Sequence, residues 1–217
     1  MWVINMKKVL KIMIIVMIAL CMVIAITGCG KKADDNNKET KEEKREFSMG
    51  EWEGNVYKND FLGFTYTMPE EWTRSTDEEI ADEMKIAKDL LTDKQQLAYE
   101  ASKLNNVYYL VASNEKTGDN VRVISEKTSS SVSTIDYINA VKSGLAEVTT
   151  IKYEEVGVTK EKLGNIDCDV LTEKGVYLGV TVYQKYYVYK VDNYCVSVIV
   201  TTSAGESKID EMVACFK

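Results

Sequence analysis

The side chains that could do chemistry in this chain are carboxylates, thiols and tyrosines, because histidine is absent. Without histidine, Ser-His-Asp and Cys-His catalysis, histidine-ligated zinc and the usual general base near neutral pH are excluded. An enzyme would need paired carboxylates, a lysine-activated serine or a metal held by oxygen ligands. The carboxylate candidates are Glu70-Glu71, Asp77-Glu78-Glu79, Glu154-Glu155, and Asp167 with Asp169.

The carboxylate pattern favours structure over catalysis. The first three runs are typical of helix starts and solvated faces, because carboxylates stabilise the first turn of a helix. Asp167 and Asp169 alternate with apolar residues, so a strand places both carboxylates on one face. Two side chains supply too few oxygens for calcium, and no calcium-binding loop motif is present. We therefore expect no catalytic residue, no metal site and no cofactor.

Three cysteines in the second half, Cys168, Cys195 and Cys215, leave two interpretations open. They are small apolar core residues, or Cys168 and Cys195 form a bridge between strands and leave one thiol. A catalytic thiol is disfavoured, because no histidine is present to lower its pKa.

The first 28 residues have the form of a signal peptide. Lys7, Lys8 and Lys11 precede an apolar run from Ile12 to Thr27, which ends in Ile26-Thr27-Gly28-Cys29. This tetrapeptide resembles the lipobox of bacterial lipoproteins, in which the cysteine is lipidated and the chain is cut before it. The resemblance implies a diacylglyceryl anchor on Cys29 and a location on the outer face of the bacterial cytoplasmic membrane. An uncleaved helix would place the remainder of the chain on the same side.

Residues 29–50 form the lipidated cysteine and a charged tether, and residues 51–217 form one domain. The tether carries equal numbers of basic and acidic residues and little to bury, so we expect a flexible coil. The leader is basic, so the acidic excess behind the net charge of −7 lies in the domain. An acidic domain without a lysine or arginine cluster excludes nucleic acid as a partner.

Tyrosines gather near the end of the domain. Aromatic rings with polar tips are favoured at interfaces, although strand propensity explains tyrosine equally well. Strict alternation places Tyr187 and Tyr189 on one face and Tyr186 with Val188 on the other. The possible recognition surface consists of Tyr183, Tyr186, Tyr187 and Tyr189.

The periodicity predicts an α+β domain with a mainly antiparallel sheet packed by helices. Residues 61–68 form a strand that Pro69 stops, and residues 106–125 form a hairpin. Capping patterns at Thr76-x-x-Glu79, Thr92-x-x-Gln95, Ser133-x-x-Asp136 and Ser203-x-x-Glu206 predict helix starts. From Tyr153 to Thr202, strands are separated near Gly164-Asn165, Lys174-Gly175 and Asp192-Asn193.

Two segments carry a further resemblance. "YKNDFLGFTYTMPEEW" is similar to the beginning of the PsbP-like fold, and "YYVYKVDNYCVSVIVTTSAGESKIDEMVACFK" is similar to its closing strand pair and terminal helix. The resemblance implies an α/β/α sandwich and a loose tendency to bind other proteins. The motifs that carry it concern packing and not catalysis.

The sequence thus predicts a membrane-anchored extracytoplasmic lipoprotein without enzymatic activity. Its expected partner is an envelope protein or a small-molecule ligand. The alternative is a histidine-independent envelope enzyme, such as a hydrolase that uses carboxylates.

Overall fold

The computed structural model describes residues 45–82, 105–146, 151–177 and 179–217. Cys29, the leader, most of the tether and the Thr92-x-x-Gln95 pattern lie outside these residues. None of the helices in the described ranges is long and apolar enough to cross a membrane.

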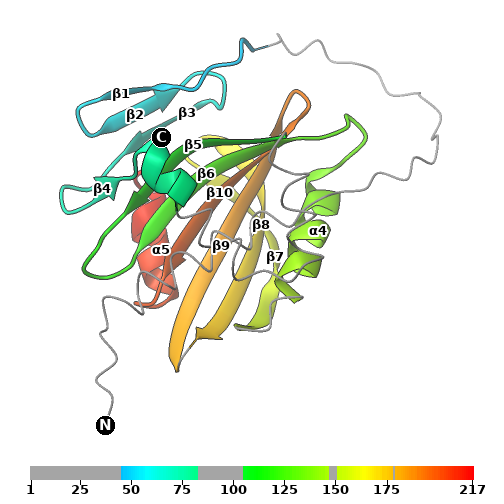
Figure 1. Cartoon of the computed structure of the whole chain (residues 1–217). Coiled ribbons are helices and arrows are strands. Elements are labelled where there is room, and N and C mark those ends of the chain that lie inside the picture. Colours follow the sequence, from blue (N-terminus) through cyan, green and yellow to red (C-terminus); the bar gives the residue numbers. More distant parts are fainter. Residues whose placement is uncertain (1–44, 83–104, 147–150, 178) are drawn as a thin grey trace.

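The described residues of the domain form two antiparallel sheets (Figure 1). A small sheet has the order β1-β2-β3, and a large sheet has the order β4-β5-β6-β10-β9-β8-β7. The small-sheet strands are β1 (Glu51–Glu53), β2 (Val56–Asn59) and β3 (Phe64–Thr67). The large-sheet strands are β4 (Thr73–Arg74), β5 (Asn106–Ser113), β6 (Asn120–Lys127), β7 (Lys152–Leu163), β8 (Ile166–Tyr177), β9 (Val180–Val191) and β10 (Tyr194–Thr202).

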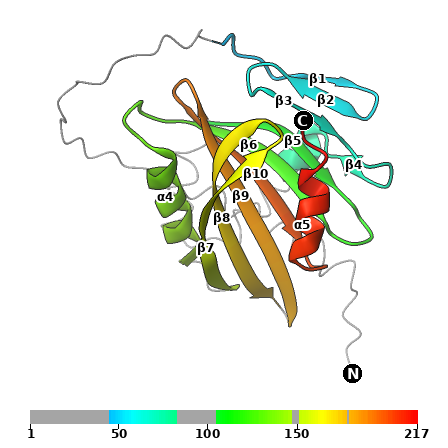
Figure 2. The ribbon, with the colours of Figure 1, turned by 180° about the vertical axis from the view of Figure 1, so that it is seen from behind.

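Among the described residues, helices α4 and α5 pack on opposite faces of the large sheet, as Figures 1 and 2 show from opposite sides. The face of helix α4 (Thr134–Ala146) buries Ile138 and Val141 against Leu171, Tyr186 and other residues of the central strands. The opposite face buries helix α5 (Glu206–Val213) and the small sheet over a second apolar cluster. The predicted α+β class, with helices on both faces of an antiparallel sheet, is confirmed.

The predicted hairpin of residues 106–125 is confirmed, since β5 pairs with β6 from Asn106↔Glu126 to Ser113↔Asn120. The first predicted strand begins three residues later than expected. Phe61 and Leu62 belong to a turn in which the Leu62 N–H donates to Asn59 Oδ1 at 2.9 Å, and β3 begins at Phe64.

Two of the three predicted breaks are correct, at Gly164-Asn165 and at Asp192-Asn193. The third break lies later than expected, between Tyr177 and Val180, because β8 continues through Lys174 and Gly175. Gly175 lies where a Cβ would come within 2.8 Å of Ile151 Cγ2, so the glycine permits close packing and makes no turn.

Candidate functional site

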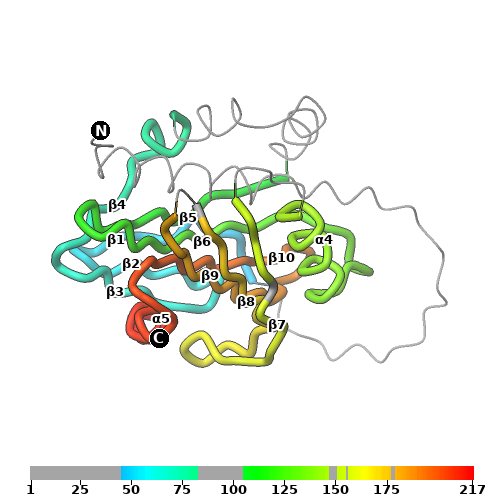
Figure 3. Tube along the Cα trace, turned by 90° about the horizontal axis from the view of Figure 1, so that it is seen from below, coloured from blue at the N-terminus to red at the C-terminus, as the bar shows by residue number. Residues whose placement is uncertain are grey.

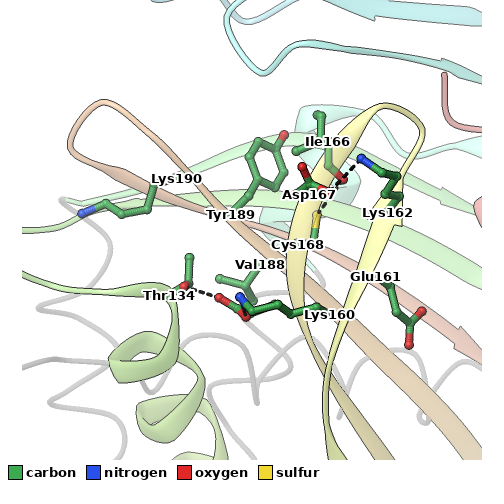
Figure 4. Close-up of a pocket in the computed structure, with 11 residues that line it drawn as sticks. Thr134, Lys160, Glu161, Lys162, Ile166, Asp167, Cys168, Val188, Tyr189 and Lys190 are labelled. Carbon is green, nitrogen blue, oxygen red and sulfur yellow. Dashed lines mark hydrogen bonds and ion pairs between the residues drawn. The ribbon is translucent and has the colours of Figure 1, made fainter. Parts of the chain in front are cut away.

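A cavity of about 600 Å³ opens where the β7–β8 hairpin separates from β9. Its walls come from β7, β8, the end of β9 and the start of α4 (Figure 4). This volume lies within the range of roughly 300–1,000 Å³ that is usual for ligand sites. We refer to it as the β8–β9 cleft.

Two ion pairs line the α4 side of the cleft. Lys160 Nζ lies 2.8 Å from Asp169 Oδ1, and Lys162 Nζ lies 2.7 Å from Asp167 Oδ1. Both pairs join residues that are directly opposite in the β7–β8 ladder, where facing side chains come close enough to interact. The prediction that Asp167 and Asp169 share one strand face is confirmed.

Asp169 also joins the sheet to helix α4, because its Oδ2 accepts a hydrogen bond from Thr134 Oγ1. The bonds from Lys160 and Thr134 hold the pKa of Asp169 below its ordinary value. The same contact with Asp169 raises the pKa of Lys160. Both groups are therefore charged at neutral pH and compensate each other, which leaves neither as a general base or nucleophile.

The third lysine of the cleft, Lys190, has neutral partners among the described residues. Its Nζ donates to the carbonyl oxygen of Val132 at 2.7 Å and lies 3.4 and 3.5 Å from those of Ser130 and Ser129. These bonds hold the loop before α4 against β9. Because carbonyls carry no net charge, the positive charge of Lys190 is not cancelled by them.

The other side of the cleft is less polar and faces α5. Cys168 is 3% exposed and Tyr189 is 5% exposed, and both pack in the cluster beneath the small sheet. Burial raises the pKa of the Cys168 thiol to about 12, so the thiol stays protonated and unreactive at neutral pH. Tyr189 donates from its hydroxyl to the carbonyl oxygen of Leu62 at 3.1 Å.

Glu161 of β7, which also lines the cleft, forms an ion pair on the α5 face. Lys185 Nζ lies 2.9 Å from Glu161 Oε1 and 3.0 Å from Oε2, and the Tyr187 hydroxyl donates to Oε2 at 3.1 Å. Burial alone would raise the pKa of Glu161, but these bonds outweigh burial and the pKa lies lower. Glu161 is thus a structural carboxylate that is held ionised.

The predicted tyrosine surface does not form. Tyr187 and Tyr189 lie in the cluster under α5 and the small sheet, and Tyr186 lies in the cluster under α4, as the alternation predicted. All three are at most 5% exposed, so they form no tyrosine surface on which a partner protein could dock, and of the three only Tyr189 reaches the lining of the cleft. Tyr183 is half-buried, with Lys174 Nζ 6.0 Å from its ring centroid.

The cysteines do not pair. Cys168 lies on the α5 face of the large sheet and Cys195 on the α4 face, and both are free thiols. A bridge would have to pass through the sheet, so the interpretation as apolar core residues holds. The described residues contain no group of three or more cysteine and carboxylate side chains placed to hold a metal.

Sequence reasoning missed the three lysines and Thr134, although one signal was available. In "KEKLGNIDCD" two lysines and two aspartates stand symmetrically about the two-residue turn Gly164-Asn165, which is the pattern of cross-strand ion pairs. No signal in the sequence indicates that the hairpin separates from β9, because this depends on contacts with distant residues.

No family model matches the chain, and no curated protein matches its sequence. Several solved structures are similar in shape at low sequence identity. Cyanobacterial PsbP (CyanoP) from Synechocystis is 11% identical with a TM-score of 0.49, over 77% of this chain and 97% of that one. LpqN, described as involved in cell envelope biogenesis of Mycobacterium tuberculosis, is 10% identical with a TM-score of 0.39, over 70% of this chain and 77% of that one. A protein from Bacteroides thetaiotaomicron is 15% identical with a TM-score of 0.38, over 72% of this chain and 45% of that one.

Proposed function

We propose that this chain is a lipid-anchored binding protein of the bacterial envelope, attached through Cys29 to the outer face of the cytoplasmic membrane. Its domain binds an envelope protein or a small ligand in the β8–β9 cleft and catalyses no reaction. The lipobox-like residues before Cys29 support the anchor, since a diacylglyceryl group supplies the two chains that stable anchoring needs.

The observation that carries the binding role is the chemistry of the cleft. It has the volume of a ligand site, yet each of its carboxylates faces a lysine and its thiol is buried and protonated. Such a site offers shape and hydrogen bonds, while it lacks an activated nucleophile or a general base. The absence of histidine from the chain supports the same proposal.

Mass spectrometry of the protein from native membranes tests the anchor. We expect the mature chain to begin at Cys29 with a diacylglyceryl thioether. A Cys29→Ala variant should carry no diacylglyceryl group and should not be cut before residue 29. A native chain that retains residues 1–28 with an unmodified Cys29 thiol would refute the lipid anchor.

Site-specific photocrosslinking in growing cells tests the binding role. Benzoylphenylalanine at Asp167, an exposed cleft residue, should give a discrete crosslinked species. The matched control carries the probe at Glu154, which is exposed on β7 and is not part of the cleft lining. Equal crosslinking at both positions would count against the cleft as the binding site.

A further inference from the structure

The ladder between β8 and β9 ends before the two strands do. Its pairs run from Tyr177↔Val180 to Asp169↔Val188, whereas β8 begins at Ile166 and β9 continues to Val191. In the same register the next hydrogen-bonded pair would be Asp167 with Lys190. That pair does not form between the described strands.

The direction of the free main-chain groups follows from the neighbouring turns. In an antiparallel ladder, residues that exchange hydrogen bonds with one neighbour alternate with residues that point to the other side. The two-residue turns close on Leu163↔Ile166 and Val191↔Tyr194, so Ile166 and Cys168 bond to β7. The N–H and C=O groups of Asp167 and Lys190 therefore point into the cleft from opposite walls.

The separation has a visible cause at the tip of the β7–β8 hairpin. Figure 3 shows the hairpin turning away from β9 toward α5 and the end of the chain. At the tip, a Cβ on Gly164 would lie 2.9 Å from the main chain of Lys217. The turn at Gly164 and the last residue of the chain are therefore in close contact. Such a contact would hold the hairpin tip away from β9.

Charge distinguishes the two sides of the cleft. On the α4 side, Lys160 and Lys162 are cancelled by Asp169 and Asp167, and Lys190 is held by carbonyls only. That side therefore carries one positive charge in a domain that is acidic as a whole. On the α5 side the wall is Ile166, Cys168 and Tyr189, which suits an apolar side chain, and Glu161, whose charge is compensated by Lys185.

We propose that the β8–β9 cleft binds an extended polypeptide segment of a partner protein, whose main chain pairs with Asp167 and Lys190. Successive side chains of an extended segment point to opposite faces. One side chain of the bound segment therefore meets the positive α4 side, where a carboxylate is complementary. The next side chain meets the apolar wall at Cys168. This mode is strand addition inside a sheet, in which main-chain bonds supply affinity and alternate side chains supply specificity. It rests on the proposed binding function and names its partner class.

A polypeptide fits these groups better than an ion. A metal ion would have to displace lysines from Asp167 and Asp169, and an anion would find a single lysine without a carboxylate partner among the cleft residues. Paired N–H and C=O groups on both walls are complementary to another main chain, which carries the same donors and acceptors.

Amide hydrogen exchange on the full-length chain in detergent tests the open pair without any ligand. We expect the amides of Asp167 and Lys190 to exchange about a hundredfold or more faster than those of Asp169 and Val188, which close the ladder. Equal protection of all four amides would mean that the strands pair fully, and the inference would fail even if the protein binds a partner elsewhere.

Selection from phage-displayed random seven-residue peptides on the same preparation tests the binding mode. Selected peptides should contain an acidic residue next to an apolar one and should slow exchange at Asp167 and Lys190. Methylating one internal peptide nitrogen should weaken binding about tenfold, as expected for one lost hydrogen bond of about 1.4 kcal/mol. If no peptide is selected, or if N-methylation at every position leaves affinity unchanged, the proposal is overturned.

Charge variants complete the test. Lys162→Gln, at a side chain that is 63% exposed, should weaken peptide binding several-fold and reduce its dependence on salt. Lys190→Gln should do the same, with Lys190→Arg restoring affinity. The matched control is Lys152→Gln at the opposite end of β7, which should bind as the original chain does. An equal loss in all three glutamine variants would indicate a nonspecific charge effect and would contradict the proposal, whatever the outcome for the anchor at Cys29.

Discussion

Glu126 is a carboxyl group in the interior of the large sheet. It lies on β6 between Asn106 of β5 and Cys195 of β10, and it is 6% exposed. Burial raises its pKa from 4.5 to about 7, because the ionised form loses its hydration. Folding at neutral pH therefore places a partly ionised carboxylate where the protonated acid is preferred.

The sign of the effect follows from proton binding. Between pH 4.5 and about 7 the folded state holds a proton that the unfolded state has lost, so the free energy of unfolding falls as pH rises. We predict that Glu126→Gln removes this fall and stabilises the protein at pH 8 by up to about 3 kcal/mol. At pH 5 the difference should shrink to less than about 1 kcal/mol.

Urea denaturation between pH 5 and pH 8 measures this difference. The control is Glu115→Gln, at an exposed residue of the β5–β6 turn. If the original chain and Glu126→Gln lose stability in parallel as pH rises, another group causes the pH dependence.

Single residues also show what the sequence could and could not predict. The alternation of Tyr186 and Tyr187 between two faces followed from strand geometry alone and is correct. Their burial did not follow, because it requires knowing that a helix covers each face. Lys190 could not be placed in a site, since its partners at residues 129–132 come from a loop about 60 residues earlier.

At the scale of elements, helix starts also show what the sequence could and could not predict. The pattern at Thr76 is confirmed, with the Thr76 N–H bonded to Glu79 Oε2 at 2.7 Å and the Glu79 N–H to Thr76 Oγ1 at 3.2 Å. The pattern at Ser133 is confirmed in the same way with Asp136. The pattern at Ser203 is wrong, because α5 begins after Gly205, whose φ of 104° turns the chain so that no side chain caps the helix.

The cap of α4 gives a prediction at this scale. Ser133→Ala should destabilise the protein by about 1 kcal/mol, because the Asp136 N–H loses its acceptor. The control is Ser143→Ala in the same helix, where the Ser143 hydroxyl donates to the Asn139 carbonyl. Because alanine is the better helix former, we expect this variant to lose no stability. Urea midpoints measure both variants. A loss at Ser143→Ala as large as at Ser133→Ala would show that the cap contributes nothing of its own.

Gly175 shows why one element boundary was misplaced. A glycine after a lysine between two strand-like runs is typical of a turn. Here the glycine instead admits Ile151 and Tyr153, whose side chains lie within 3.3 Å of the position of a Cβ. Such a close approach across the β7–β8 ladder depends on tertiary packing, which local sequence patterns do not contain.

At the scale of the whole molecule, the large sheet separates the thiols. Cys168 and Cys195 are buried on opposite faces, while Cys215 near the end of the chain is half-buried. We predict that iodoacetamide at pH 8 modifies Cys215 in the folded protein, and modifies Cys168 and Cys195 only in denaturant. Peptide mapping by mass spectrometry identifies each site. A peptide containing a Cys168–Cys195 disulfide would contradict this placement.

The small sheet is joined to the rest of the molecule through the last residues of the chain. The Thr65 N–H donates to the Lys217 carbonyl at 2.8 Å, and the Lys217 N–H donates to the Thr65 carbonyl at 2.9 Å. Between them Phe216 packs on Phe64 and Tyr66, with ring centroids 5.3 and 4.8 Å apart. These contacts extend the small sheet by one short bridge and cover the apolar cluster under α5.

Phe216→Ala should therefore weaken the docking of the whole small sheet. Phe216 is 3% exposed, and removing a buried phenylalanine costs about 3–5 kcal/mol through lost transfer energy and the cavity left behind. Phe47→Ala is the control. Phe47 also packs on an aromatic ring, that of Phe61, with ring centroids 5.3 Å apart, but it is 48% exposed, so its replacement should lower the stability less. Urea denaturation followed by tryptophan fluorescence measures the stability of both variants, because Trp52 lies in the small sheet and Trp72 in the buried cluster.

Phe216→Ala should also narrow the difference in amide exchange between Asp167 and Asp169, since the β7–β8 turn loses its contact with a fixed Lys217. If Phe216→Ala is no less stable than Phe47→Ala and leaves that difference unchanged, the end of the chain holds neither the small sheet nor the cleft.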